Sequence, residues 1–359
     1  MRIIRYLKNR HSRLCEMSKS GGKNLCWLIK DFLKFRNNRL ISFEEYENYK
    51  LYSRNNEFRI NFLSYRLAEY YWEVLNPRTY ACLARDKFIG HCLLDSVGIP
   101  TAKLIAYYNK ESAVSSTLIG KDYEDIINLL KSSSVQSFVI KPAKDSAHGT
   151  GVIVCRRLIE KKGEYFIRKF DGSEISLKKL LGDVPLIFEE TIIQIDQLRN
   201  LNESSLNTIR IMTALYPDST VNVFAAFIKI GRHGSDIDNA GSGGNIDCGV
   251  NVETGKLYNA EQFDSWSNIK KIQFHPDSNA ELNGMKIKNW HSIIAKLKYY
   301  QGLIPQLKII GWDVAITDGG PVIIEINNWW DTTGQEFIDM GWAGEVENCY
   351  NAWVKYYGK

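Results

Sequence analysis

The spacing of apolar residues along the chain changes near residue 80. Before that point apolar positions recur every three or four residues, as at Leu25, Leu28 and Phe32, and no stretch alternates as a strand does. A period of three to four residues places the apolar side chains on one face of a helix. We therefore predict a basic, mainly helical region over residues 1–79.

Beyond residue 80, predicted helices and strands are interspersed. Helices are expected over 86–97, where Gly98 and Pro100 end the pattern, and near 122–132, 289–301 and 341–357. A strand is expected after Pro100, in the run that ends at residue 108. Short apolar runs bounded by turn residues predict further strands at 138–142, 151–155, 164–170, 185–191, 207–216, 221–230, 309–317 and 321–327. The last two strands are joined by Asp318-Gly319-Gly320, a sequence typical of a hairpin turn. The pattern as a whole predicts an α+β protein.

Composition excludes several classes of protein. The chain has 359 residues, 44% hydrophobic and 24% charged, which is typical of a globular protein with room for two or three lobes. No apolar run approaches the roughly 20 residues that a membrane-spanning helix needs. The start, MRIIRYLKNRHSR, lacks the apolar stretch of a secretory signal, so we expect a cytoplasmic chain. Seven scattered cysteines without a C-x-x-C pair indicate reduced thiols.

Positive charge is concentrated at the N-terminus. The chain carries 46 Lys and Arg against 41 Asp and Glu, but residues 1–40 hold eleven of the basic residues against Glu16 and Asp31 alone. The amphipathic stretch from Leu25 to Phe35 fits a helix lying on an anionic membrane surface. It equally fits a helix that packs on its own domain and displays a solvated basic face. No nucleic-acid reader motif follows the basic stretch, so we expect no nucleic-acid partner.

Acidic residues in the last predicted hairpin indicate a metal site. Antiparallel register about Gly319 sets Asp313 opposite Glu325, and Asn327 shares the face of Glu325. Facing carboxylates repel each other, and a hard cation such as Mg²⁺ would relieve the repulsion. The alternative is that both carboxylates are simply solvated at a sheet edge.

A lysine and a small-residue loop suggest phosphate binding. Lys141 lies inside an apolar strand, where an unpaired ammonium would be costly, so it should have an anionic partner. The loop after Pro142, which contains Ser146, Gly149 and Gly151, could present backbone N–H groups to phosphate oxygens. It does not have the Walker A pattern.

These features in this order resemble the ATP-grasp superfamily, over roughly residues 80–335. The strings SLNTIRIMTALY, DNAGSGGNID and GWDVAITDGGPVIIEINN are similar to the sugar-transfer-associated ATP-grasp family. The resemblance implies an ATP-grasp fold, in which two α+β lobes grip ATP. We assign the first lobe to residues 80–190 and the second, with the metal site and an aromatic C-terminal helix, to residues 191–359.

The resemblance also implies roles for individual residues. Lys87 and Lys141 match the family's phosphate-binding lysines, and the loop 144–151 would close over the phosphates. The hinge from Glu189 and Glu190 to Ile192 would pair with the adenine edge, and Gln194 or Asp196 would hold the ribose. The nucleotide-binding residues that the resemblance implies are Lys87, Lys141, Ser146, Gly149, Gly151, Glu189, Glu190, Ile192 and Asp196.

The resemblance places the chemistry in the second lobe. Asp313, Glu325 and Asn327 match the family's magnesium ligands. Arg210 matches an arginine that stabilises the transferred phosphoryl group, Lys229 stands where relatives often carry arginine, and Asn239 belongs to a loop on the acceptor side.

The function implied by the resemblance is an ATP-dependent carboxylate–amine ligase that acts through an acyl-phosphate. It would modify a sugar acid or attach an amino acid during capsule, O-antigen or other envelope-glycan synthesis. The expected cofactors are ATP and Mg²⁺, the expected partner is a small-molecule or glycan acceptor, and residues 1–40 could touch the inner membrane face. The alternatives are a phosphotransferase acting on a sugar or related acceptor, and a non-catalytic nucleotide or glycan binder.

Overall fold

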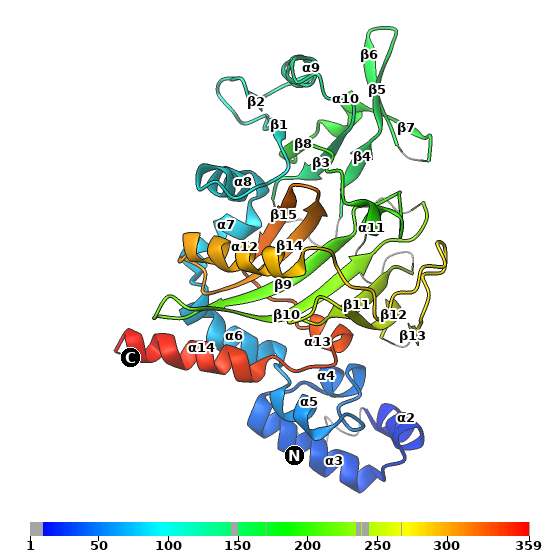
Figure 1. Ribbon diagram of the computed structural model, residues 1–359, viewed down its shortest axis with the longest axis vertical. Coiled ribbons are helices and arrows are strands. Elements are labelled where there is room, and N and C mark those ends of the chain that lie inside the picture. The colour runs from blue at the N-terminus through cyan, green and yellow to red at the C-terminus, as the bar shows by residue number, and fades with distance from the viewer. Residues whose placement is uncertain are drawn as a thin grey trace.

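The computed structural model describes residues 10–144, 150–169, 171–234, 238, 244–266 and 268–358. Along this part of the chain, a helical N-terminal region is followed by a five-stranded and then a seven-stranded sheet. Figure 1 shows the seven-stranded sheet in the middle, with the N-terminal helices below it and the five-stranded sheet above it. The predicted α+β class, with its mainly helical N-terminal region, is confirmed.

The N-terminal region is built from short helices around an aromatic core. The helices are α2 (His11–Gly21), α3 (Leu25–Arg39), α4 (Phe43–Asn48), α5 (Asn56–Asn61) and α6 (Tyr65–Leu75). Four of them begin where a side chain accepts a backbone N–H bond, at Asn24, Ser42, Asn55 and Ser64. Phe32, Phe43 and Tyr46 are fully buried in the core that results.

The apolar face of α3 packs inside this core. Leu28 and Phe32 are buried, and Trp27, Ile29 and Phe35 are partly buried against the same cluster. Of the two alternatives for this helix, packing on its own domain therefore accounts for its apolar residues. Within the described residues, no helix combines the length and the apolar character required to cross a bilayer.

The N-terminal region is fixed to the C-terminal part of the chain. Arg39 pairs with Glu347 at 2.5 Å, and Arg54 pairs with both Glu336 and Asp339. Gly341 lies against the backbone of Asn61, where a Cβ atom would come within 2.2 Å of a main-chain carbon. The N-terminal helices and the C-terminal segment therefore meet in a close, charged contact.

The five-stranded sheet has the order β2-β1-β8-β3-β4. Its strands are β1 (Leu104–Tyr108), β2 (Ile119–Gly120), β3 (Phe138–Pro142), β4 (Ile153–Cys155) and β8 (Leu186–Glu190). Helix α9 (Tyr123–Ser132) packs Ile126, Ile127 and Leu130 against it. A separate three-stranded sheet extends from it, with strands β5 (Arg157–Lys161), β6 (Glu164–Arg168) and β7 (Glu174–Ser176), followed by α10 (Leu177–Leu180). Short elements connect the parts: η1 (Arg78–Tyr80), α7 (Cys82–Arg85), α8 (Lys87–Ser96) and α11 (Asp196–Arg199).

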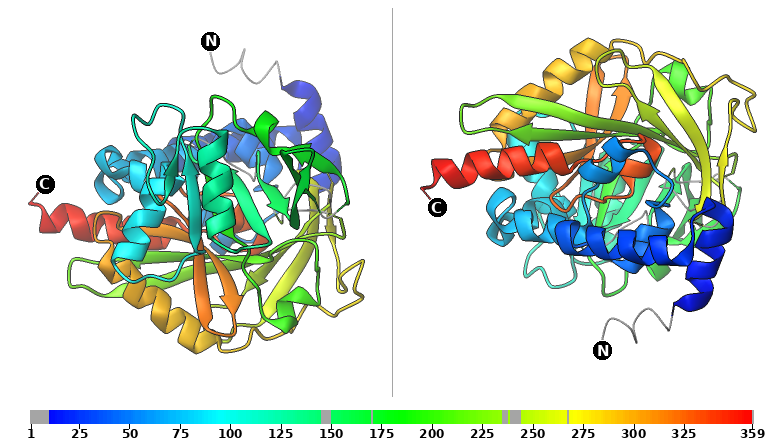
Figure 2. Two further views of the ribbon diagram at one scale, coloured as in Figure 1. Left: turned by 90° about the horizontal axis from the view of Figure 1, so that it is seen from above. Right: turned by 90° about the horizontal axis from the view of Figure 1, so that it is seen from below.

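The seven-stranded sheet is antiparallel throughout, with the order β13-β12-β11-β10-β9-β14-β15. The strands are β9 (Thr208–Leu215), β10 (Val221–Ile230), β11 (Ile246–Val250), β12 (Leu257–Ser265), β13 (Asn268–Lys271), β14 (Ile309–Thr317) and β15 (Gly320–Asn327). Helix α12 (Trp290–Leu303) packs Trp290, Ile293 and Leu297 on one face. Helices α6, α13 (Gly334–Phe337) and α14 (Ala343–Tyr356) cover part of the other face. Figure 2 (right) shows α12 and α14 on opposite sides of the sheet.

The structure contains strands that the hydrophobic pattern did not predict. The predicted strands at 138–142, 221–230 and 309–317 have the bounds of β3, β10 and β14. In contrast, β11, β12 and β13 are absent from the prediction. Strand β11 is short and contains an Asp and a Gly, and β12 breaks its alternation at Asn259, whose φ is 51°.

Candidate functional site

The hairpin of β14 and β15 brings two carboxylates together. Near the turn Thr317 lies opposite Gly320, and the pairing is regular as far as Val314. A β-bulge at Ile324 then shifts the register by one residue, so that Asp313 lies opposite Glu325. The predicted pairing is confirmed, although simple register about Gly319 was the wrong reason for it.

The bulge also decides which side chains reach the cavity beside this hairpin. Ile324 and Glu325 both line the cavity, whereas Ile323 and Ile326 are buried in the core under α12. A regular strand would place two consecutive side chains on opposite faces. The inserted residue therefore adds an apolar group next to the acidic one.

Two basic residues of neighbouring strands bind Asp313. Arg210, opposite Asp313 on β9, donates from Nε at 2.6 Å and from Nη2 at 3.0 Å to the two carboxylate oxygens. Lys229 on β10 reaches the same carboxylate, with Nζ 3.3 Å from Oδ1. Such bidentate, charge-assisted contacts fix the orientation of a carboxylate.

The two carboxylates have different electrostatic surroundings. Burial opposes the ionisation of Asp313, but Arg210 and Lys229 outweigh it and hold the pKa of Asp313 well below its usual range. Burial, together with the charge of Asp313, raises the pKa of Glu325. Burial opposes the charge of Lys229 as well, yet the carboxylates around it, Asp313 foremost, together outweigh burial and leave the pKa of Lys229 raised. An added cation would favour the ionised form of Glu325.

Two lysines face this hairpin from the other sheet and the helix beside it. Asp86 caps α8 by accepting bonds from the N–H groups of Phe88 and Ile89, and this places Lys87 at the first helical position. The Nζ atom of Lys87 lies 3.7 Å from Oε2 of Glu325. Lys141 on β3 binds Oε2 of Glu189 on β8 at 2.6 Å. The anionic partner predicted for Lys141 is therefore Glu189.

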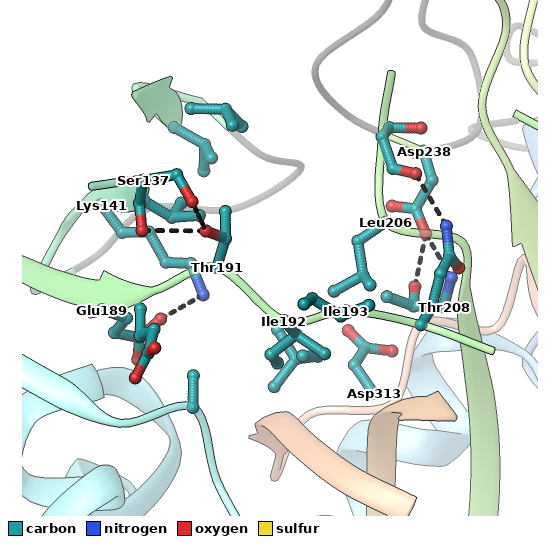
Figure 3. A pocket seen from close by; sticks show the side chains of 18 of the residues that line it. Ser137, Lys141, Glu189, Thr191, Ile192, Ile193, Leu206, Thr208, Asp238 and Asp313 are labelled. Carbon is teal, nitrogen blue, oxygen red and sulfur yellow. Dashed lines mark hydrogen bonds and ion pairs between the residues drawn. The ribbon is translucent and has the colours of Figure 1, made fainter. Parts of the chain in front are cut away.

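A cavity of about 400 Å³ lies between the two sheets. Its size is that of a small-molecule site. Of the predicted residues, it is lined by Lys87, Lys141, Glu189, Glu190, Ile192, Gln194, Lys229, Asp313 and Glu325. Further lining residues are apolar, including Val139, Val154, Leu206 and Ile324, and could enclose a planar ring. Figure 3 shows Lys141 with Glu189 on one side of the cavity and Asp313 on the other.

The segment after β8 forms the edge of the cavity. The N–H of Glu190 donates to the carbonyl of Lys103, and that of Thr191 donates to the carbonyl of Ser137. The N–H of Ile192 donates to no backbone carbonyl in the described part of the chain. Ile192 therefore retains a main-chain donor where the hinge to the adenine edge was predicted.

The acidic pair has the ligand chemistry of a magnesium site that is completed by a substrate. The described residues contain no group of three His, Cys, Asp or Glu side chains arranged to hold a metal. Asn327 donates from Nδ2 to the carbonyl of Gly311, which leaves its Oδ1 as an acceptor. Mg²⁺ in phosphate-transfer sites takes one or two carboxylates and fills its shell with waters and phosphates. Asp313, Glu325 and Asn327 fit such an ion.

Several predicted residues lie away from the cavity lining. Arg210 contacts the cavity through Asp313, and Asn327 lies beyond Glu325 on β15. Gly151 has a φ of 77° and lies against the ring of Pro142. Asp196 binds Arg199 on α11. Gln194, in contrast, lines the cavity, and its side chain is held by the backbone of Ser205 and Asn207. Ser146, Gly149 and Asn239 lie outside the described residues, and the roles of all these residues stay predictions.

The cavity contains polar residues that sequence reasoning missed. Asp238 lines it and accepts bonds from the N–H and the hydroxyl of Thr208, at 2.7 and 2.6 Å. Arg156 and Arg199 lie in its wall. Asp238 is adjacent in sequence to Asn239, which was predicted to lie in the loop on the acceptor side. That adjacency was the one feature of the sequence that could have indicated Asp238.

Comparison with known proteins gives one family match. The sequence profile of the sugar-transfer associated ATP-grasp family matches residues 66–348. No curated protein matches the chain.

Among solved structures, the chain is similar to the ADP complex of N5-carboxyaminoimidazole ribonucleotide synthetase, at 12% identity over 80% of this chain and 58% of that one, with a TM-score of 0.44. It is similar to the VanG D-Ala:D-Ser ligase of Enterococcus faecalis, at 14% identity over 77% and 62% of the two chains, with a TM-score of 0.40. A third is the D-alanine–D-alanine ligase of Helicobacter pylori, at 13% identity over 82% and 68%, with a TM-score of 0.43. The chain thus spans 58 and 62% of the length of the first two structures.

Proposed function

Because the chain belongs to the sugar-transfer associated ATP-grasp family, we propose that it is an ATP-dependent ligase that activates a carboxylate as an acyl-phosphate and joins it to an amine. One observation carries the proposal. The pair Asp313 and Glu325 lines one side of a cavity of nucleotide size, with Lys87 next to Glu325 and Lys141 on the other side of the cavity. Acidic groups for a divalent cation and ammonium groups for phosphates around one cavity suit a bound triphosphate.

The reaction has two displacements. In the first, an oxygen of the substrate carboxylate attacks the γ-phosphorus of ATP, the bond to the β–γ bridging oxygen breaks, and ADP leaves. In the second, the amine nitrogen attacks the carbonyl carbon, the bond to the phosphate oxygen breaks, and phosphate leaves with the electron pair. The products are an amide, ADP and phosphate.

The residues of the chain position the groups and offset their charge. Lys87 and Lys141 would hold phosphate oxygens, and Ile192 would donate its N–H to the adenine edge. A magnesium ion held by Asp313, Glu325 and Asn327 would neutralise phosphate charge during transfer. Arg210 and Lys229 lie beside this position and would stabilise the transferred phosphoryl group, which needs no nucleophilic side chain.

The acceptor we propose is a sugar acid or an amino-acid-bearing glycan intermediate of envelope polysaccharide synthesis. The description of the family as sugar-transfer associated supports this choice. The exposed lysines of α2, α3 and the link between them support a contact with anionic lipid or anionic glycan.

Turnover with candidate substrates tests the proposal. The full chain is supplied with Mg-ATP and pairs of uronic acids and amino acids, ADP release is followed, and the product is identified by mass. A product with a new amide bond supports the ligase function. A stable phosphorylated sugar would instead support the alternative, a phosphotransferase. Magnesium-dependent turnover that persists in the Asp313→Asn, Glu325→Gln double variant would contradict the assignment of these residues.

A further inference from the structure

A buried carboxylate on β11 has no hydrogen-bond partner among the described residues. Asp247 has 0% exposure, and neither of its oxygens accepts a hydrogen bond within the described part of the chain. In the register of the sheet it lies between Lys229 on β10 and Glu261 on β12, on the face that carries the cavity. A buried acceptor without a donor lowers the stability of the folded protein. Binding of a ligand or of a proton to Asp247 would remove this cost.

A second carboxylate, Asp238, lies at the cavity itself. Asp238 lines the cavity and is held by two bonds from Thr208, as Figure 3 shows. It is 8% exposed, and both Asp238 and Asp247 lie close enough to Lys229 for its charge to lower their pKa values. Burial is the larger influence and leaves the pKa of each carboxyl raised.

Charge along this face of the sheet changes sign. Next to the acidic pair of the hairpin lie Arg210 and Lys229, which both bind Asp313. On the far side of Lys229 follow Asp238, Asp247 and Glu261. Among the described residues, neither Asp238 nor Asp247 forms an ion pair, because the ammonium of Lys229 is turned to Asp313. A group of buried carboxyl groups therefore adjoins the position where the phosphoryl group would be transferred.

We propose that Asp238 and Asp247 form the subsite for the ammonium group of the amine co-substrate. The inference rests on the proposed ligase function and adds to it the place and the charge of the second substrate. An ammonium group has three N–H donors, and Asp238 and Asp247 keep free oxygen acceptors to receive them. Two carboxylates close to one ammonium form charge-assisted hydrogen bonds, which are stronger than neutral ones.

The subsite also gives the amine a proton acceptor. The amine arrives as R–NH₃⁺ and must lose one proton to expose the lone pair that attacks the acyl carbon. A carboxylate of the subsite takes that proton. After attack, the second proton leaves with the phosphate as HPO₄²⁻, and the sum is acyl-phosphate plus R–NH₃⁺ giving amide, HPO₄²⁻ and one H⁺.

Amine binding can be measured before the natural substrate is known. The full chain with Mg²⁺ and a non-hydrolysable ATP analogue is mixed with glycine, ethanolamine or glucosamine, and saturation-transfer NMR detects the bound amine. The N-acetylated counterparts of the three probes have the same skeletons without the positive charge. The proteins compared are wild type, Asp238→Asn, Asp247→Asn and Asp218→Asn, the last being the same change in the exposed β9–β10 turn.

We expect at least one free amine to bind wild type and Asp218→Asn, and its N-acetyl form to bind neither. Binding should weaken about tenfold or more in Asp238→Asn and Asp247→Asn, because each loses a charge-assisted bond. Melting curves establish that the variants fold. Nucleotide affinity is measured in the same samples, so that a failure of the proposed ATP-dependent function can be distinguished from a failure of the amine subsite. If nucleotide binds but no amine does, or if amine binding survives in both variants, the subsite is refuted.

Discussion

At the scale of single residues, the same chemical group behaves differently according to its neighbours. Asp313 and Glu325 face each other, but Arg210 binds Asp313 with two hydrogen bonds, while Glu325 has Lys87 at 3.7 Å. The first carboxylate is ionised by its partners, and burial and repulsion raise the pKa of the second. Glu325 is therefore the member of the pair whose ionisation responds to an added cation.

We expect Glu325→Gln to fold with unchanged or higher stability near neutral pH, because the change removes the repulsion with Asp313. Magnesium-dependent nucleotide affinity should fall about tenfold or more, since the loss of even an outer-shell partner of a metal typically costs 10–100-fold. Calorimetric titration with the ATP analogue, with and without Mg²⁺, measures the effect. Glu253→Gln, in an exposed turn, is the control, and an equal loss there would contradict the assignment.

A second prediction concerns Glu261, which is 2% exposed. Burial, and to a lesser degree repulsion by Glu336, raises the pKa of Glu261 to about 7. The folded chain then keeps this proton up to about pH 7, whereas the unfolded chain releases it above its ordinary pKa of 4.5. Stability contributed by this group is therefore present at low pH and is lost as the pH rises from about 4.5 to 7.

Glu261→Gln should raise the free energy of unfolding at pH 8 by on the order of 1–3 kcal/mol and change it little at pH 4.5. Urea denaturation at both pH values measures the difference. Glu253→Gln serves again as the exposed control. A gain of the same size at both pH values would show that the carboxyl group of Glu261 does not titrate in this range.

At the scale of elements, the bulge in β15 places two neighbouring side chains in different environments. Ile323 is 1% exposed in the core under α12, whereas Ile324 lines the cavity next to Glu325. The bulge thus interrupts the alternation of side chains between the two faces of the sheet, and two consecutive residues, Ile324 and Glu325, lie on the same face.

The two isoleucines should respond differently to truncation. Ile323→Ala is expected to lower the free energy of unfolding by about 2–4 kcal/mol and to leave the nucleotide affinity of the folded protein unchanged. Ile324→Ala should leave stability within about 1 kcal/mol and weaken nucleotide binding several-fold, because the cavity loses an apolar wall. Denaturation measures the free energy of unfolding of both variants, and calorimetric titration measures their nucleotide affinity. The bulge would be misplaced if Ile324→Ala were the more destabilising change.

The elements that carry most of the expected site were predictable, because their residues follow simple patterns. Continuous apolar runs marked β3, β10 and β14, and Asp-Gly-Gly marked the turn that pairs Asp313 with Glu325. Strands β11 to β13 were missed, because Asp247 and Glu261 interrupt the apolar pattern with buried charges. Asp238 was missed as well, because its place depends on Thr208, a contact between segments 30 residues apart. The bulge at Ile324 leaves no mark in composition or spacing.

At the scale of the whole molecule, the N-terminal helices are part of the packed structure. Leu28 and Phe32 of α3 are buried with residues of α4, and Arg39 and Arg54 hold the region to the C-terminal segment. Deleting residues 1–40 would therefore remove core residues along with the positive charge. A test of membrane contact must change the surface alone.

Replacing the exposed Lys19, Lys23, Lys30 and Lys34 by Gln provides that test. At low salt the variant should bind vesicles containing anionic lipid more weakly, because each surface-bound lysine contributes about 1 kcal/mol. Vesicle sedimentation measures binding, and melting temperature should stay near that of wild type. The matched control changes the exposed Lys286, Lys288, Lys296 and Lys298 near α12. Equal binding of both variants would dismiss a role for the N-terminal lysines.

The pairing of Arg210 with Asp313 bears on the sequence in which ligands assemble. Each oxygen of Asp313 accepts one hydrogen bond from the guanidinium of Arg210 and keeps a second lone pair. A cation bound to Asp313 would share the carboxylate with Arg210 and weaken that contact, which would leave the guanidinium better able to bind a phosphate. Binding of the cation and binding of the phosphate therefore favour each other. The pocket should bind free inorganic phosphate and bare divalent ions weakly, and should bind a complex of the two more tightly.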